Sequence, residues 1–370
     1  MMFMEYKQIK WLLGAVPLAL LMACSEATYC AQCVVGHLDV MSRRRPIADV
    51  LLDPSVPEKE RAQLAKVIDI RAFAIDELGL PDNDSYRLYA NIGRPYVVWN
   101  VVATPELSLT PKQWCYPVVG CVAYQGYFDA DVAKAKGEEL VAQGYDVDVY
   151  GVKAYSTLKW FDDPVLNTFL DGADSQLAGL IFHELAHQVV YVADDCSFNE
   201  AFAKTVEIEG LRRWLRANVD GTAWQEYLAR EQRSQEFLEL LKKVREQLTV
   251  LYSRSLADEQ KRAGKSEILA GLEKTLRDQR DQWPNPSAID KWLERELNNA
   301  RLTSIATYHD QVPAFQAILE AQGGELTAFY EEVGRLAKLP VVERTAQLKA
   351  YGIVEIKTAC AEQPEHLRNK

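Results

Sequence analysis

Two histidines one helical turn apart are the sharpest chemical signal in this chain. They lie in the segment His-Glu-Leu-Ala-His at residues 183–187, in a chain with only five histidines. On a helix, His183 and His187 project from the same face and can bind one metal ion. Imidazole nitrogens suit Zn²⁺, and Glu184 can face the water that completes the metal shell. The spacing therefore predicts a zinc site in which Glu184 is the general base.

A catalytic zinc ion takes three protein ligands, so a third must come from elsewhere in the chain. No histidine follows His187 closely, but Glu200 lies 13 residues beyond it in the segment Asn-Glu-Ala-Phe-Ala. A helix–loop–helix of that length can fold Glu200 back onto the metal. Glu207, two helical turns further along the same face, is expected to orient a ligand histidine. It is also the rival candidate for the third ligand.

Peptide hydrolysis at such a site needs a donor for the oxyanion and a surface for an extended substrate. Tyr308 is the candidate donor, and His309 is the alternative. Two strand edges are candidates for the substrate surface, Val147–Tyr155 and Gly120–Tyr124. The sequence leaves both choices open.

Two helices, at about 175–192 and 200–215, are expected to position the metal ligands. Aromatic and β-branched residues before them predict strands at Tyr96–Val102, Cys121–Phe128 and Tyr145–Tyr155. Several strands ahead of a helical half indicate an α+β fold.

The second half of the chain is expected to be almost entirely helical. One long helix is predicted from Trp224 to about Ala263, a break at Gly264, and a second helix to Trp283. The two helices are expected to form a charged, solvated hairpin arm. The overall expectation is a predominantly helical α+β fold with a small sheet and this arm. Its predicted parts are a signal peptide (1–23), a tether (24–45), a mixed part with the metal site (46–220) and a helical part (221–370).

The N-terminus resembles the signal peptide of a bacterial lipoprotein. Lys7 and Lys10 precede an apolar run of 13 residues, Trp11–Ala23, which is too short to span a bilayer. The run ends in Leu-Met-Ala-Cys, so Cys24 is the expected lipidation site and new N-terminus. Residue 25 is serine and not aspartate, which favours the outer membrane over retention at the inner membrane. We therefore expect a body tethered by lipid to the bacterial envelope, facing the periplasm.

Cysteine usage agrees with an oxidising compartment, because six cysteines remain once Cys24 is set aside. Cys115 and Cys121 flank a short turn and are the best candidate disulfide. The pairing of the others stays open; these are Cys30, Cys33, Cys196 and Cys360. The net charge of −11 argues against nucleic acid as a partner, so a peptide or protein substrate is expected.

The motif at 183–187 followed by Asn199-Glu200 resembles the gluzincin metallopeptidases, which include thermolysin and the large zinc aminopeptidases. In the aminopeptidases the third ligand lies in an Asn-Glu-Gly-Phe-Ala motif, which matches Asn199–Ala203, and a further glutamate matches Glu207. The families place the ligand glutamate farther from the second histidine. Their GxMEN segment, which binds the substrate's free amine, is absent here.

A closer resemblance, to a bacterial family described as predicted aminopeptidases and zinc lipoproteins, covers nearly the whole mature chain. It rests on stretches such as Gly93–Val101, Trp114–Val118 and Trp160–Pro164, together with the helix that carries the two histidines. The resemblance implies a zincin-like core, bound Zn²⁺ and aminopeptidase activity. Two alternatives remain: an endopeptidase of the envelope, or a non-catalytic, metal-stabilised adaptor lipoprotein.

Overall fold

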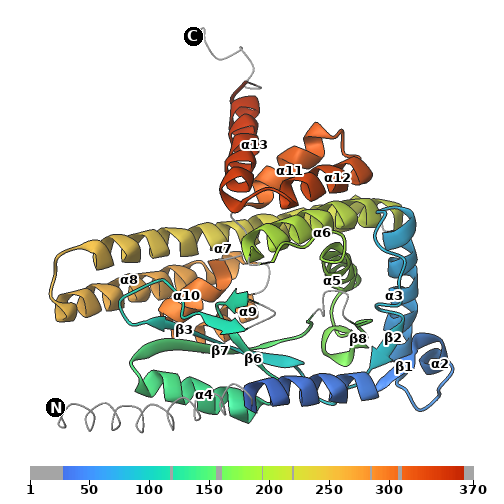
Figure 1. Ribbon diagram of the computed structural model, residues 1–370, viewed down its shortest axis with the longest axis horizontal. Helices are drawn as coiled ribbons and strands as arrows, with labels where there is room; N and C mark the ends of the chain where they lie inside the picture. The colour runs from blue at the N-terminus through green and yellow to red at the C-terminus, as the bar shows by residue number, and fades with distance from the viewer. Residues whose placement is uncertain are drawn as a thin grey trace, which may run out of the picture.

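The computed structural model describes residues 28–116, 120–155, 161–193, 195–218, 221–283, 286–306 and 311–361. These residues form a predominantly helical protein with three small sheets, in agreement with the expected α+β class. Figure 1 shows the sheets in the lower half, a layer of long helices above them, and α11–α13 at the top.

A helix over residues 28–42 opens the described chain. The strands are β1 (Arg44–Pro46), β2 (Leu88–Ala90), β3 (Val98–Pro105), β4 (Trp114–Tyr116), β5 (Gly120–Val122), β6 (Gln125–Tyr127), β7 (Tyr145–Val152) and β8 (Val165–Leu166). The helices are α2 (Ile47–Leu51), α3 (Glu58–Asp76), α4 (Ala130–Ala142), α5 (Asp174–Ala186), α6 (Cys196–Asn218), α7 (Gly221–Ser253), α8 (Asp258–Asp278), α9 (Pro286–Leu293), α10 (Asn299–Ala306), α11 (Val312–Ala321), α12 (Leu326–Ala337) and α13 (Val341–Ala361).

The central sheet is antiparallel, with strand order β6-β3-β7. Side chains alternate between its faces, so Val101 and Ala103 of β3 pack into one apolar cluster with Leu140 of α4. Gly137 lets α4 approach closely, because a Cβ there would lie 2.8 Å from the side chain of Val149. The opposite face of the sheet is turned toward α10.

Two smaller sheets complete the strand structure. One has the order β1-β2-β8 and joins the N-terminal region to the segment just before α5. The other is the β4–β5 pair, across which a disulfide links Cys115 to Cys121, the pair that the sequence singled out.

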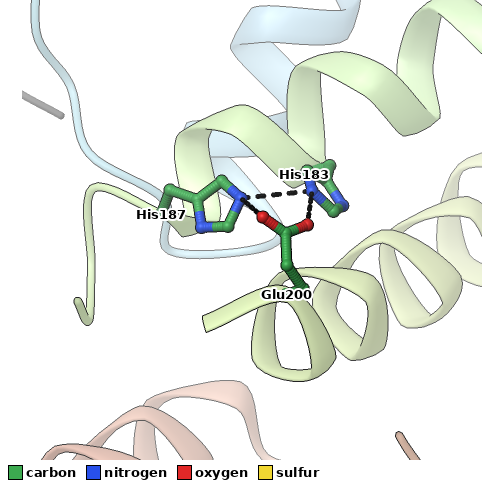
Figure 2. Close-up of side chains that lie close together, drawn as sticks. All are labelled: His183, His187 and Glu200. Carbon is green, nitrogen blue, oxygen red and sulfur yellow. Dashed lines mark hydrogen bonds and ion pairs between the residues drawn. The ribbon is translucent and has the colours of Figure 1, made fainter. Parts of the chain in front are cut away.

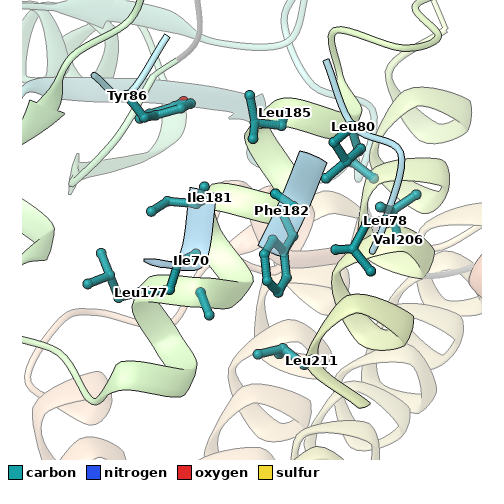
Figure 3. Packing of buried hydrophobic residues seen from close by; sticks show 14 of the residues in the cluster. Ile70, Leu78, Leu80, Tyr86, Leu177, Ile181, Phe182, Leu185, Val206 and Leu211 are labelled. Carbon is teal, nitrogen blue, oxygen red and sulfur yellow. The ribbon is translucent and has the colours of Figure 1, made fainter. Parts of the chain in front are cut away.

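The largest apolar cluster surrounds α5 (Figure 3). Leu177, Ile181 and Leu185 recur at helical spacing and are buried against α3 and α6. Phe202 of α6 stacks on Phe329 of α12, so the C-terminal helices pack on the same core. The helix that carries the histidines is therefore held on several sides.

Two glycines let α5 and α6 lie close together. A Cβ at Gly179 of α5 would lie 3.1 Å from Leu211 and 3.4 Å from Glu207. A Cβ at Gly210 of α6 would lie 2.7 Å from the ring of Phe182. Real Cβ atoms do not approach as closely as at Gly210, so this helix spacing requires glycine there, whereas a Cβ at Gly179 would need Leu211 to shift by a few tenths of an ångström.

The ends of these two helices differ from the sequence prediction. α5 ends at Ala186, so the predicted extension to residue 192 is wrong. α6 begins at Cys196, which places Glu200 in its second turn and not at its start. The connection between the helices, residues 187–195, is thus nine residues long, against seven in the prediction.

The hairpin forms, but its predicted turn is wrong. α7 ends at Ser253 and α8 begins at Asp258, so Gly264 lies inside α8. A Cβ at Gly264 would lie 3.0 Å from Leu251, so this glycine permits close packing between the two helices. The hairpin is also more than a solvated arm, because Lys265 and Arg262 form ion pairs with Asp146 and Glu106 of the sheet region. No helix among the described residues combines the length and apolar character needed to cross a bilayer.

Replacing Gly210 with alanine is expected to destabilise the protein by about 1–3 kcal/mol, because the new methyl group would overlap the buried ring of Phe182. Gly271→Ala in α8 is the matched control, since no atom lies within 4 Å of a Cβ there. Helix propensity alone should make that control neutral or up to about 1 kcal/mol more stable. Urea unfolding of both variants measures the difference, and equal effects would contradict the tight contact.

Candidate metal centre

Two consecutive helices bring three metal-ligating side chains together. His183 lies in the last turn of α5, His187 directly follows that helix, and Glu200 comes from α6. One ligating atom from each residue can be chosen so that all three lie within 4.8 Å of one another. Figure 2 shows the two imidazole rings and the carboxylate pointing toward one another. The three residues predicted as ligands therefore converge.

The distances between these atoms test whether a metal ion fits. The two Nε2 atoms are 3.2 Å apart, and Glu200 oxygens lie 3.3 Å from Nε2 of His183 and 3.7 Å from Nε2 of His187. With zinc–ligand bonds of about 2.0–2.1 Å, tetrahedral geometry places ligand atoms about 3.3 Å apart. The side chains as they stand are thus suited to one small dication.

Glu207 orients His183 from the side away from Glu200. Its Oε2 atom lies 3.2 Å from Nδ1 of His183, which leaves Nε2 of that ring for a metal. Carboxylates that hold the second ring nitrogen of a ligand histidine are a regular feature of metal sites. The geometry therefore fits Glu207 as an orienting carboxylate and Glu200 as one of three candidate ligands.

Lys204 supports this arrangement and was missed by the sequence reasoning. Its Nζ atom lies 2.8 Å from Glu207 and 3.7 Å from Glu231, which belongs to α7. Burial opposes the charge of Lys204, but the two carboxylates outweigh it and raise the lysine pKa. The i,i+3 spacing of Lys204 and Glu207 was a signal in the sequence for their ion pair. Glu231 reaches the same lysine only because α7 packs beside α6.

A polar network fixes the chain just after the second histidine. Gln188 accepts a hydrogen bond from Asn83 at 2.5 Å and donates one to Ser85 at 3.1 Å. Arg71 of α3 donates to the carbonyl of Ser85 at 2.7 Å. Because Gln188 adjoins His187, these bonds hold the end of α5 against residues 83–85.

The metal-free site carries a proton on one imidazole. Burial opposes the charge of His183, but hydrogen bonds to Glu200 and Glu207 prevail and raise its pKa to about 10. Burial and the neighbouring His183 lower the pKa of His187 to about 4. The site thus already holds positive charge between its carboxylates, at the place where a cation would bind.

Glu184 has the environment expected of a proton acceptor. Burial raises its pKa to about 7, with Glu200 and Asp163 adding to the shift and His183 opposing it. Tyr86 lies beside it, since burial and then the charge of Glu184 raise the tyrosine pKa. A carboxyl group with such a pKa can both accept and release a proton near neutral pH.

One of the two candidate strand edges is already partly covered. On β7, the carbonyl of Val147 accepts a bond from Asn298 at 2.9 Å, and that of Val149 accepts one from Arg295 at 3.3 Å. Burial, followed by the charges of Cys196, Tyr150 and Glu200, raises the pKa of Tyr124, which follows β5. The covered carbonyls count against β7, and Gly120–Tyr124 is the other candidate edge.

The remaining predicted residues receive no structural test. Tyr308, its alternative His309 and the lipidation site Cys24 all lie outside the described residues. Cys30 and Cys33 form no disulfide with any residue that the structure describes.

Comparison with known protein families shows which family the chain belongs to. A family model described as "Putative aminopeptidase" matches residues 28–348, which is most of the chain and includes both helices of the metal group. The chain belongs to this family. No curated protein and no solved structure matches it. Membership in the putative aminopeptidase family supports a peptidase at the level of the family name, while the zincin-like core remains a prediction.

Glu200→Ala is expected to abolish stoichiometric zinc binding, because it removes one of three converging ligands. Glu207→Ala should retain zinc with affinity lowered about 10–100-fold, as is typical when an orienting carboxylate is lost. Competition with a chromophoric chelator measures both, and Glu236→Ala on the exposed face of α7 is the control. Retained affinity in Glu200→Ala with full loss in Glu207→Ala would reverse the two roles.

Lys204→Met should weaken zinc binding about tenfold without unfolding the protein, because Glu207 loses the cation that holds it toward His183. Lys134→Met is the matched control, since that lysine lies exposed on α4 and pairs only weakly with Glu138 at 3.9 Å. The same chelator competition measures both variants. An unchanged affinity in Lys204→Met would show that Glu207 needs no such support.

Proposed function

We propose that this protein is a zinc-dependent aminopeptidase tethered by lipid to the bacterial envelope. The observation that carries the proposal is the convergence of His183, His187 and Glu200 at ligand-like distances, with Glu184 beside them. The family name supports the peptidase class, and the chemistry of the site supports zinc as the metal.

The mechanism assigns a separate task to each side chain. His183, His187 and Glu200 would hold a zinc ion, which would supply an activated water and a Lewis acid for the peptide carbonyl. Glu184 accepts a proton and passes it to the leaving amine, a role suited to its pKa of about 7 in the metal-free protein. Glu207 holds the His183 ring through Nδ1. A donor for the oxyanion is also needed, and Tyr308 and His309 remain the candidates.

The proposed substrate is an extended peptide that pairs with the chain at Gly120–Tyr124. We prefer this edge because Asn298 and Arg295 already occupy two carbonyls of β7, and because the charge of Glu200 contributes to the raised pKa of Tyr124. Backbone pairing would bind peptides of varied sequence, while nearby tyrosines would contact their side chains.

An adaptor role is less well supported than catalysis. Glu184 is not one of the three candidate ligands. A purely structural metal site would not need a buried carboxyl group beside it whose pKa is raised to about 7. The envelope location rests on the sequence alone, through the positive residues, the apolar run and Cys24.

The same peptides with free and acetylated amino termini separate the two peptidase classes. An aminopeptidase releases single residues from the free peptide and leaves the acetylated one intact. Internal cleavage of both would favour the envelope endopeptidase, and no cleavage of either by zinc-loaded protein would favour the adaptor.

Glu184→Gln is expected to lower peptide hydrolysis by about 10²–10⁴-fold while zinc remains bound, because the amide cannot accept the proton. Turnover and zinc content are measured on the same samples. Glu138→Gln, on the exposed side of α4, is the control. Undiminished turnover in Glu184→Gln would refute the assigned role.

A further inference from the structure

The helix over residues 28–42 is fixed to the body by one of its faces. Gln32 donates to the carbonyl of Gly126 at 3.1 Å and accepts from the backbone N–H of Phe128 at 3.2 Å. The hydroxyl of Tyr29 accepts a bond from the backbone N–H of Gly126 at 3.2 Å. At Gly36 a Cβ would overlap the ring of Phe128, so the helix lies as close to this part of the chain as glycine allows.

The opposite face of this helix is apolar and exposed. Val34, Val35 and Leu38 are 58%, 67% and 58% exposed, and they lie at positions i, i+1 and i+4. Together with exposed Ala31 they form one strip, which we call the outer strip. Because the inner face is held by several hydrogen bonds, the outer strip cannot rotate toward the core.

The charges near the outer strip do not prevent contact with an apolar surface. Asp39 is the single acidic residue of the segment 28–42. Its carboxylate lies 2.9 Å from Arg43 and 3.6 Å from Arg94, so its negative charge is compensated. Exposed apolar residues scattered singly are normal, but a fixed and continuous strip indicates an interaction site.

The length of chain before this helix identifies what covers the strip. Three residues lie between Cys24 and Thr28, and the four residue steps span at most about 14 Å of extended chain. A lipid on Cys24 would therefore hold the start of the helix within reach of the headgroup region. The helix itself has 15 residues and a length of about 22 Å, so it can lie along the membrane surface.

We propose that the outer strip of the helix 28–42 inserts into the headgroup region of the bilayer, so that this helix lies flat on the membrane and orients the whole protein. The inference rests on the lipid anchor of the proposed function and goes beyond it, because a lipid on Cys24 alone would not fix which side of the body faces the membrane. Figure 1 shows this helix along the lower edge of the molecule and α13 at the upper edge. The α13 side would then face away from the membrane.

The test uses the mature lipoprotein in vesicles of phosphatidylethanolamine and phosphatidylglycerol that contain a diazirine-bearing phospholipid. After irradiation, peptide mapping by mass spectrometry compares labelling at residues 31–38 with labelling at Val341 and Val342. These two valines are 58% and 77% exposed at the start of α13, so exposure alone predicts equal labelling. We expect about tenfold more label on the outer strip.

Two matched variants make the test specific. The triple change Val34→Gln, Val35→Gln and Leu38→Gln should lower labelling of the helix about tenfold, whereas Val341→Gln with Val342→Gln should leave it unchanged. Circular dichroism verifies that both variants are folded. Equal labelling at the two sites, or labelling that survives the triple change, overturns the proposal. The proposal is also overturned if the outer strip carries no label and the protein forms dimers through this strip.

The same samples separate this inference from the proposed function. Intact mass shows whether Cys24 carries lipid, and peptide hydrolysis is measured independently. If the outer strip is labelled but Cys24 carries no lipid, the membrane contact is supported and the proposed lipid anchor is refuted. A lipidated, active protein with an unlabelled strip would end the orientation proposal alone.

Discussion

The metal centre depends on how closely α5 and α6 can approach each other. The histidines belong to one helix and the carboxylate to the next, so each small change in helix spacing alters the ligand distances. Gly179 and Gly210 lie at this interface, and a side chain at Gly210 would collide with Phe182. Because a zinc site tolerates deviations of only a few tenths of an ångström, the absence of a side chain at Gly210 is a condition for the ligand geometry above it.

Charge compensation extends this constraint outward from the ligands. A dication at the site would face Glu200 directly and Glu207 through the His183 ring. Lys204 lies between Glu207 and Glu231, so the outer carboxylates share a permanent cation even without a metal. Such an arrangement is in place before binding, so little reorganisation is needed when the ion arrives. A metal on Nε2 of His183 would displace the proton that the raised pKa places on this ring, so metal binding would depend on pH.

The convergence of these residues was predictable because helical periodicity alone places His183 and His187 on one face, and a helix–loop–helix can return Glu200 to that face. The disulfide was predictable for a similar local reason. The role of Lys204 was not, because it depends on α7, whose position follows from packing far along the chain. Gly264 misled the prediction in another way: glycine breaks helices in isolation, yet here it permits two helices to touch. Local rules therefore succeeded where the constraint was local.

The hairpin shows why packing between distant segments also matters for the site. Near its start, α7 contributes Glu231 to the Lys204 pair, and further along Leu248 packs in the cluster shared with α8. α8 is in turn tied to the central sheet, since Lys265 lies 2.6 Å from Asp146. One continuous helix of 33 residues thus connects the surroundings of the metal ligands to the sheet on which α4 and α10 pack. Because Glu231 of this helix pairs with Lys204, and Lys204 with Glu207, the hairpin takes part in the contacts that surround the candidate metal centre.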